Sequence, residues 1–356
     1  MDLKERLYNW WNERVDLDNL LAFLNHKTVP HHRHSIWYYV GGMCLYLFIV
    51  QVITGILLLL YYKPTAEAAY ESVQYIMTDV PFGWLVRSIH SYAANIFIGL
   101  IFVHMFSVFL MKAYRKPREL TWITGVVLLL LAMGFGFSGY LLPWNQLAYL
   151  ATNVGTNFAI MTPVIGDWLL VFLRGGTEVT GATLTRFFGF HVAVLPGIFT
   201  SVLGLHLLFV QRLGMSVPIS IEKEISDGKA QREEMPFVPN FLYRDILGWT
   251  LALGLIVLLS SMFPWELGEK ADILTPAPPH VKPEWFFVFM YQTLKYVPKT
   301  IGVFGFAIGG AVWILLPFFD RKSNRGEPNK LYTVIGVFVV IYMVALTLIG
   351  YLAPGE

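Results

Sequence analysis

Long apolar stretches separated by shorter polar segments run along the whole chain. An α-helix needs about 20 apolar residues to cross a bilayer, and seven stretches are about that long. They are residues 36–60, 84–110, 121–142, 188–211, 245–264, 301–319 and 331–352. The longest polar stretch separates the first four from the last three. The pattern therefore predicts an all-α polytopic membrane protein, with a four-helix bundle over 36–211, an extramembrane linker over 212–244 and a three-helix domain over 245–356.

Composition agrees with this prediction. Of the 356 residues, 56% are hydrophobic and 14% are charged, which is too apolar for an ordinary soluble domain. The formal net charge of +2 gives no reason to expect a nucleic-acid partner. Residues 1–35 begin as a charged amphipathic pattern without a small-residue cleavage site. We expect this N-terminal segment to lie at the membrane interface, with Trp10 and Trp11 at the surface.

The positive charges define an orientation. If the N-terminus is inside, the inner segments carry 18 of the 26 Lys and Arg residues and the outer segments carry 8. Because cytoplasmic segments carry an excess of Lys and Arg, we predict that the N-terminus lies inside and the C-terminus outside. The second and fourth spans then both begin at the outer face and run parallel.

Four histidines lie in those two parallel spans, His90 and His104 in one, His191 and His206 in the other. Spacings of 14 and 15 residues correspond to about 21 and 22 Å of helix and return to roughly the same helix face. Histidine is a common axial ligand of haem iron, and polar groups in a bilayer tend to be functional. We therefore predict two bis-histidine haems, an outer one held by His90 and His191 and an inner one held by His104 and His206.

Glycines repeat the 14-residue spacing in the first and third spans, as Gly41 and Gly55 and as Gly125 and Gly139. A porphyrin packed against a helix needs a missing side chain, which glycine supplies. Glycine is also common where membrane helices touch. Beside the four histidines, the haem interpretation is the stronger one.

Several long motifs resemble the cytochrome b subunit of cytochrome bc complexes, the quinol:cytochrome c or plastocyanin oxidoreductases. The motifs are RSIHSYAANIFIGLIFVH (87–104), KPRELTWITGV (116–126), SGYLLPWNQ (138–146), ATLTRFFGFHVAVLPG (182–197) and PPHVKPEWFF (278–287). The 15-residue histidine gap and KPRELTWITGV are similar to the cytochrome b6f type, as is the total of seven helices. PPH before PEWFF is more like the bc1 type. The resemblance implies a prokaryotic chain closest to a cytochrome b6 fused to a subunit IV.

The sequence departs from that family at two places. Phe286 stands where the family motif has a tyrosine, so a hydroxyl is missing from the quinol site that the resemblance implies. The family's b6f members bind a further haem covalently through a cysteine, and Tyr39 occupies that position here. The chain has one cysteine, Cys44, which lies five residues further on, about 140° round the helix. A covalent third haem is therefore not expected.

The resemblance also implies a Q cycle. Quinol would be oxidised at the outer face, electrons would cross through two b haems, quinone would be reduced at the inner face, and protons would be translocated. Glu284 is the implied catalytic proton acceptor, and burial of a carboxyl raises its pKa toward neutrality. A Rieske iron–sulfur protein and a cytochrome c-type subunit are the implied partners, beside membrane lipid and a second copy of the complex. The implied location is the bacterial inner membrane.

Further residues are assigned to these sites. Arg87 and Arg186 precede haem histidines and are candidates for pairing with propionates of the outer haem, or for anchoring at lipid headgroups. The candidate lining of the outer quinol pocket is Tyr140, Pro143, Trp144, Pro283, Trp285, Phe286 and Tyr291. For the inner quinone site only a neighbourhood is indicated: His206, Arg212, and Lys27 or Asp227.

Two other functions compete with this interpretation. A dihaem membrane anchor of a dehydrogenase would explain the histidines, but not the Pro-Glu-Trp-Phe motif or the three-helix second part. A proton-coupled transporter would predict broken helices and internal repeats at the midplane, and the sequence shows neither.

Overall fold

The structure is a computed structural model that describes residues 2–272 and 281–352. Seven spans in these residues are long and apolar enough to cross a membrane. They are Ser35–Leu59, Gly83–Leu110, Glu119–Leu141, Gly181–Leu213, Phe237–Met262, Lys299–Asn324 and Lys330–Leu352. The predicted number and order of spans are confirmed. The PPH part of the PPHVKPEWFF motif lies outside the described residues.

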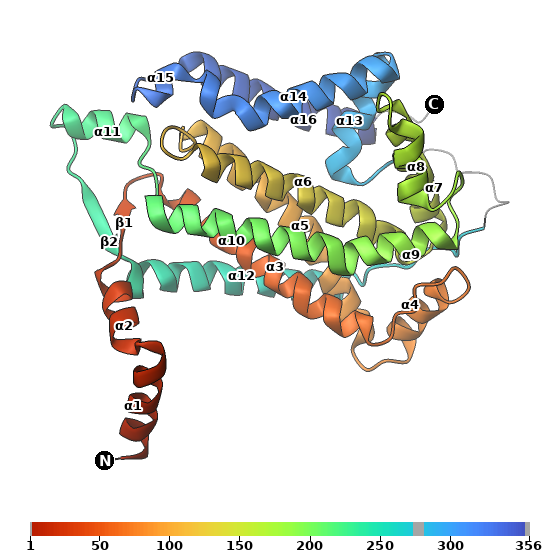
Figure 1. Ribbon diagram of the computed structural model, residues 1–356, viewed down its shortest axis with the longest axis horizontal. Coiled ribbons are helices and arrows are strands. Elements are labelled where there is room, and N and C mark those ends of the chain that lie inside the picture. Colours follow the sequence, from red (N-terminus) through yellow and green to blue (C-terminus); the bar gives the residue numbers. More distant parts are fainter. Residues whose placement is uncertain (1, 273–280, 353–356) are drawn as a thin grey trace.

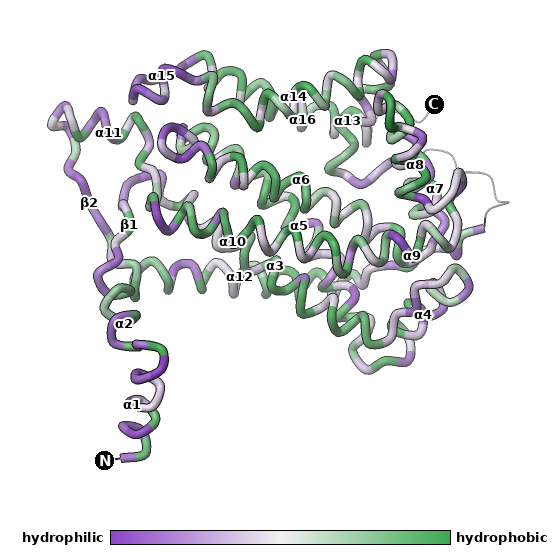
Figure 2. Tube along the Cα trace, viewed as in Figure 1, coloured by the Kyte–Doolittle hydropathy of each residue, from purple (hydrophilic) through white to green (hydrophobic). Residues whose placement is uncertain are grey.

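The long helices run side by side along the long axis of the molecule (Figure 1). They are α3 (Tyr38–Leu59), α5 (Gly83–Leu110), α6 (Glu119–Leu141), α10 (Leu195–Leu213), α12 (Leu242–Met262), α14 (Lys299–Phe319) and α16 (Lys330–Leu352). Helix α5 contacts α3, α6, α12 and α16, while α10 packs on α6. Hydrophobic residues cover these helices along most of their length and polar residues gather at their ends, as expected for spans in a bilayer (Figure 2).

The fourth span begins seven residues earlier than the pattern predicted. It comprises α9 (Gly181–Gly189), a π-helical turn (Phe190–Val194) and α10 without a break. Pro196 follows the π turn. Because proline has no backbone N–H and its ring clashes with the carbonyl four residues earlier, it accounts for the widened turn. His191 lies in this turn, so the turn takes up the extra residue of the 15-residue spacing.

Short elements close the two ends of the bundle. The end that holds the N-terminal segment and the linker is called the inner end, following the charge distribution. It carries α1 (Leu3–Val15), α2 (Leu17–His26), β1 (Thr28–His31), a 3-10 turn (Ser35–Trp37), α11 (Ile219–Ser226), β2 (Glu233–Pro236), a π turn (Phe237–Phe241) and α15 (Arg321–Asn324). The outer end carries α4 (Ala69–Thr78), α7 (Gln146–Asn157), a 3-10 turn (Phe158–Met161), α8 (Gly166–Arg174) and, closer to the bundle, α13 (Trp285–Tyr296).

The N-terminal segment is joined to the linker. Strands β1 and β2 pair antiparallel, with Val29 opposite Met235. Helices α1 and α2 leave this point crosswise to the long helices (Figure 1), and Trp10 and Trp11 are exposed. That arrangement suits a segment lying along a membrane surface, and its interfacial position stays a prediction.

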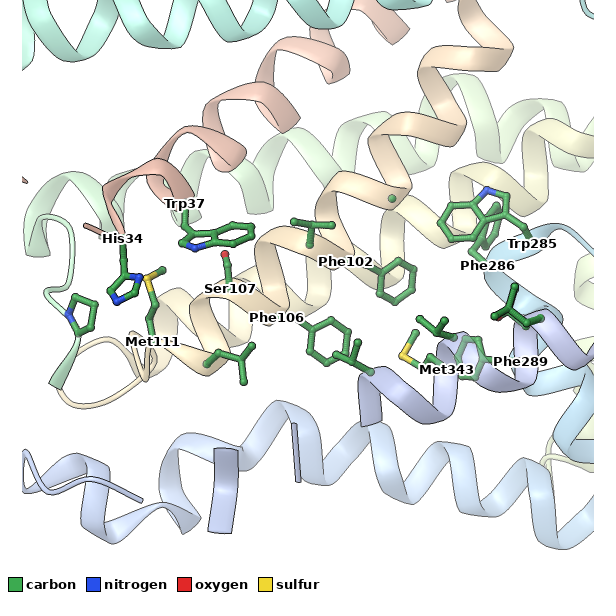
Figure 3. Close-up of a pocket in the computed structure, with 18 of the residues that line it drawn as sticks. His34, Trp37, Phe102, Phe106, Ser107, Met111, Trp285, Phe286, Phe289 and Met343 are labelled. Carbon is green, nitrogen blue, oxygen red and sulfur yellow. The ribbon is translucent and has the colours of Figure 1, made fainter. Parts of the chain in front are cut away.

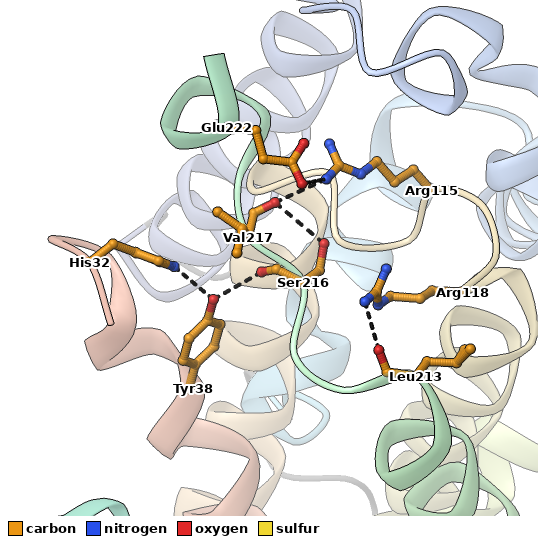
Figure 4. A network of polar contacts seen from close by, with 8 residues as sticks. All are labelled: His32, Tyr38, Arg115, Arg118, Leu213, Ser216, Val217 and Glu222. Carbon is orange, nitrogen blue, oxygen red and sulfur yellow. Dashed lines mark hydrogen bonds and ion pairs between the residues drawn. The ribbon is translucent and has the colours of Figure 1, made fainter. Parts of the chain in front are cut away.

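Polar contacts hold the inner end together (Figure 4). Tyr38 donates a hydrogen bond to the Ser216 carbonyl at 2.9 Å, and its hydroxyl lies 2.7 Å from His32 Nε2. From the loop between α5 and α6, Arg115 pairs with Glu222 and donates to a linker carbonyl, as Figure 4 also shows. These bonds connect the N-terminal segment, the α5–α6 loop and the linker, three segments far apart in the sequence.

One glycine sets the distance between the two parts of the chain. A Cβ on Gly336 of α16 would lie 2.1 Å from Cε1 of Phe109 on α5. Phe109 is completely buried and stacks on Trp313 of α14, with ring centroids 4.6 Å apart. The three-helix part therefore approaches the four-helix part closely only because residue 336 has no side chain.

We predict that Gly336→Ala destabilises the folded protein. The new methyl group overlaps a buried ring, and such overpacking costs about 1–3 kcal/mol. Thermal unfolding of the detergent-solubilised protein should show a lower midpoint. Gly309→Ala is the matched control, because nothing lies within 4 Å of a Cβ at that position on α14. Equal midpoints for the two variants would show that the contact with Phe109 does not limit packing.

Candidate functional site

The four histidines form two pairs inside the four-helix part. His90 of α5 faces His191 of the π turn, with ring centroids 6.4 Å apart and ring planes at 72°. A metal–imidazole bond is about 2 Å long, so two imidazoles on opposite sides of one metal ion have ring centres about 6 Å apart. Further toward the inner end, His104 of α5 lies near His206 of α10. These are the pairs that the sequence predicted.

Each histidine ring packs against one of the four predicted glycines. The distances from an ideal glycine Cβ to Cε1 of the ring are 3.0 Å for Gly41 and His104, 3.4 Å for Gly55 and His90, 3.2 Å for Gly125 and His206, and 2.6 Å for Gly139 and His191. From the sequence, these glycines were expected to make room for a porphyrin. In the structure, the atoms nearest to each missing Cβ belong to an imidazole ring. The glycines thus allow α3 and α6 to support the rings from behind.

A hydroxyl group fixes the tautomer of His90. Thr54, the residue before Gly55, has its Oγ1 2.8 Å from His90 Nδ1, and the same hydroxyl donates to the Val50 carbonyl at 2.7 Å. Because the hydroxyl proton is already donated, Oγ1 accepts a hydrogen bond from Nδ1–H. The Nε2 atom is then left with a free lone pair, which is the form of histidine that binds metal.

The same arrangement recurs at two further histidines. Thr124, before Gly125, donates to the Leu120 carbonyl at 2.8 Å and lies 3.0 Å from His206 Nδ1. Ser138, before Gly139, lies 3.1 Å from His191 Nδ1 and 3.3 Å from the Phe135 carbonyl. Both hydroxyls are thus placed to accept from Nδ1–H and leave Nε2 free.

His104 differs from the other three histidines. The residue before Gly41 is Val40, which has no hydroxyl, and His104 Nδ1 is buried without a hydrogen-bond partner among the described residues.

The donor set fits haem better than a bare metal ion. Within the described residues, no group of three or more His, Cys, Asp and Glu side chains could hold a metal ion. Each pair offers two imidazoles, which is the number of axial positions on a haem iron. The glycine cradles and the free Nε2 atoms therefore fit two bis-histidine haems.

The Pro-Glu-Trp-Phe motif lies at the start of α13. Trp285 donates from Nε1 to Asn95 Oδ1 of α5 at 2.8 Å. Phe286 is 3% exposed, and its Cζ would lie 2.6 Å from a Cβ on Gly136 of α6. A tyrosine carries its hydroxyl at Cζ, and α6 occupies that space here. The phenylalanine is therefore matched to the glycine that faces it.

Glu284 precedes these two anchored aromatic residues. Burial raises the pKa of its carboxyl above the usual value. The carboxyl interacts electrostatically with Tyr140 of α6 and Tyr351 of α16. The predicted proton acceptor thus lies near residues of both parts of the chain.

A long apolar groove ends beside this motif (Figure 3). Its volume is about 800 Å³. One wall of the groove is α5, with Phe102 and Phe106, and the opposite wall is formed by α13 and α16. Trp285 lies at one end of the groove, and Trp37 and His34 lie at the other. Its lining is almost entirely apolar, so it has the shape and chemistry to hold a hydrocarbon chain.

The residues predicted for the quinol pocket do not all line this groove. Trp285 and Phe286 line the groove, whereas Tyr140, Pro143, Trp144, Pro283 and Tyr291 do not. Trp144 is 5% exposed and belongs to a buried cluster at the outer end with Tyr149 and Phe187. A role in quinol binding stays a prediction for these five.

The two arginines predicted beside the outer haem already have protein partners. Arg87 is 6% exposed and donates to the carbonyls of Trp265 and Glu266, in the loop after α12. Arg186 donates to the Phe172 carbonyl at 2.7 Å. These bonds hold the outer loops in place, and contact with propionates stays a prediction.

Sequence reasoning missed Asp245, a buried carboxylate near the inner end of α12. It is 8% exposed, its Oδ1 has no hydrogen-bond partner among the described residues, and a Cβ on Gly42 would lie 2.4 Å from its oxygens. Gly42 is the neighbour of Gly41, which supports His104. An aspartate within an apolar stretch was an available signal, but its position beside the inner histidines depends on how α12 packs on α3.

Two of the four residues predicted for the inner quinone site lie around one cavity. Lys27 and Arg212 line a cavity of about 490 Å³ with His26 and Gln211, and Lys27 donates to Gln211 Oε1 at 2.5 Å. Burial lowers the pKa of Lys27. His206 and Asp227 do not line this cavity.

The cysteine and its neighbour lie on α3. Cys44 is 9% exposed and belongs to the main hydrophobic core. Tyr39, which stands in the family's cysteine position, stacks on Phe241 with ring centroids 4.6 Å apart.

Comparison with known proteins agrees with this geometry. Residues 24–214 match the family described as "Cytochrome b/b6/petB", and residues 270–356 match "Cytochrome b(C-terminal)/b6/petD". A "Cytochrome bc complex cytochrome b subunit" from Chlorobaculum thiosulfatiphilum is 46% identical over 349 residues, which cover 97% of this chain and 80% of the relative. A "Cytochrome b6" from Synechococcus sp. (strain RCC307) is 41% identical over 213 residues, 60% of this chain and 97% of the relative.

A solved structure shares the whole fold. A chain of a "Hyperthermophilic respiratory Complex III" superposes with a TM-score of 0.86 at 31% sequence identity, over 97% of this chain and 91% of the other. Two family matches, a relative that aligns with 97% of this chain and this shared fold agree with one another. The chain belongs to the cytochrome b family, with its cytochrome b/b6 part and its petD-type part joined in one polypeptide.

Proposed function

We propose that this chain oxidises quinol at its outer end, carries electrons between two bis-histidine haems, and reduces quinone at its inner end. Its family makes it the cytochrome b subunit of a bc-type quinol:cytochrome c oxidoreductase. The observation that carries the proposal is the repeated arrangement of a glycine and an imidazole, with a hydroxyl on Nδ1 and a free Nε2 in three of the four histidines.

This arrangement supports an assignment of the four haem ligands. His90 and His191 would hold the outer haem, and His104 and His206 the inner haem. When bound, the haems supply one-electron carriers on either side of the membrane midplane. Thr54, Thr124 and Ser138 orient three of the rings, and the glycines keep α3 and α6 close enough to hold them.

At the outer end, Glu284 would accept a proton from quinol. Burial raises its pKa, which favours proton uptake by this carboxyl. The bond from Trp285 to Asn95 fixes the loop that carries Glu284. The groove along α5 offers room for the apolar tail of a quinol whose ring lies near Glu284.

At the inner end, Asp245 would donate a proton to reduced quinone. It is buried against Gly42, the neighbour of the glycine that supports His104, and one of its oxygens has no partner among the described residues. Lys27 and Arg212, in the neighbouring cavity, would supply positive charge where protons enter.

Other chains must complete the reaction. The sequence has one cysteine, so an iron–sulfur cluster would belong to a separate Rieske protein, and a cytochrome c-type subunit would take the electrons onward. We place the complex, as a dimer, in the bacterial inner membrane with the N-terminus inside. A dehydrogenase anchor would leave the petD-type match and the Glu284 loop without explanation.

The proposal predicts that alanine at the four glycines reduces haem content in a graded way. Gly139→Ala and Gly41→Ala, with Cβ contacts of 2.6 and 3.0 Å, should lose more haem than Gly125→Ala and Gly55→Ala, at 3.2 and 3.4 Å. The measurement is haem per chain from a redox-titrated visible spectrum of the purified complex. Gly204→Ala is the control, since nothing lies within 4 Å of its Cβ on α10. Unchanged haem in all four variants would contradict the assigned ligands.

Glu284→Gln should slow quinol oxidation about a hundredfold, the usual effect of losing a general base, while both haem spectra stay unchanged. In the unaltered protein the rate should rise with pH through the raised pKa and then level off, because only the ionised carboxylate accepts a proton. Steady-state rates against pH test this. Glu266→Gln, at an exposed residue of the outer loop, should keep the rate and its pH profile. Retained activity in Glu284→Gln would exclude Glu284 as the base.

Asp245→Asn should slow electron transfer from the inner haem to quinone without changing quinol oxidation at the outer end, because the amide has no acidic proton to donate. Stopped-flow spectra with the outer site inhibited would follow the inner haem alone. Asp167→Asn, at an exposed residue of α8 at the outer end, is the control. Equal rates for both variants would remove Asp245 from the inner site.

A further inference from the structure

Each of the four histidine rings packs against a glycine, but the rings differ in the hydrogen-bond partner of Nδ1. In the outer pair, both Nδ1 atoms have a hydroxyl partner, at 2.8 Å for His90 and 3.1 Å for His191. In the inner pair, His206 has one at 3.0 Å. His104 has none, and its Nδ1 is buried without a partner among the described residues.

The lack of a hydroxyl partner at His104 reflects the identity of a single residue. The hydroxyls belong to the residues directly before Gly55, Gly125 and Gly139, and the corresponding residue before Gly41 is Val40. The rings are placed similarly: the Nδ1 atom lies 3.6 Å from the Cβ position at Gly41 and 3.7 Å from that at Gly125. A hydroxyl at residue 40 would therefore be within reach of His104 Nδ1, and valine excludes it.

A hydrogen bond from Nδ1–H raises the basicity of an axial imidazole. A more basic ligand donates more electron density to iron and favours the oxidised state, which lowers the reduction potential; hydrogen bonding around the ligands is one of the established influences on that potential. The outer pair has two such ligands and the inner pair has one.

We infer that Val40 raises the reduction potential of the inner haem relative to the outer haem, because valine provides no hydroxyl to accept a hydrogen bond from His104. Val40 is thus a positioning residue for the direction of electron transfer, which runs downhill from the outer pair to the inner pair. Thr54 makes the opposite contribution at the outer haem. This inference rests on the haem ligation proposed above.

The test is a redox titration of both haems in the purified complex. Val40→Thr keeps the shape of the side chain and adds the missing hydroxyl. It should shift the inner haem three- to tenfold toward the oxidised state, a fall of about 30 to 60 mV for a one-electron couple. The outer haem should keep its potential. Thr54→Val, which removes a hydroxyl, should raise the potential of the outer haem by a similar amount.

Val52→Thr is the matched control, because it adds the same hydroxyl at an exposed position of α3 and should move neither potential. If Val40→Thr retains both haems and the inner potential does not fall, the inference is overturned. If Val40→Thr loses the inner haem, Thr54→Val decides: a raised outer potential supports the role of the hydroxyls, and an unchanged one overturns it. Absence of both haems from the unaltered complex would refute the ligation itself.

Discussion

The close contact between a glycine on one helix and an imidazole on another is the constraint on which the four-helix part depends. Four such contacts hold α3 and α6 against the histidines of α5 and the fourth span. A side chain at Gly139 or Gly41 would overlap the ring that it faces, whereas the contacts at Gly125 and Gly55 are less tight. Because an unpaired polar group is costly in a bilayer, the hydroxyls before three of the glycines also matter, since each lies within hydrogen-bonding distance of a buried ring nitrogen.

Helix α5 connects the two functions of the chain. His90 and His104 lie on one face of this helix. Asn95 lies about 140° round the helix from His90 and accepts the hydrogen bond from Trp285. The same helix lines the apolar groove and packs through Phe109 on the three-helix part. The proposed electron carriers and the proposed proton acceptor are thus positioned from one rigid element, which suits a reaction that must separate electrons from protons.

The two ends of the bundle are built differently. At the inner end, Arg115, Tyr38 and the β1–β2 pair connect three distant segments through charged and hydrogen-bonded contacts (Figure 4). At the outer end, short helices bury a cluster of aromatic residues, and buried arginines such as Arg174 bind carbonyl and amide oxygens. The inner end is therefore tied by its surface polar network, and the outer end by a small core of its own.

The sequence by itself determined the seven spans and their order, and it predicted the two histidine pairs and the four glycine positions; that these glycines support the imidazole rings came only from the structure. Those features follow from helical periodicity and from the cost of polar groups in a bilayer, and both can be read within a single span. Only the tertiary structure decided three other features. A π turn at His191 accommodates the extra residue of the 15-residue histidine spacing. Phe286 fills the space left by Gly136, and Asp245 lies against Gly42. These depend on contacts between helices that are distant in the sequence, where local pattern carries no information about which side chains meet.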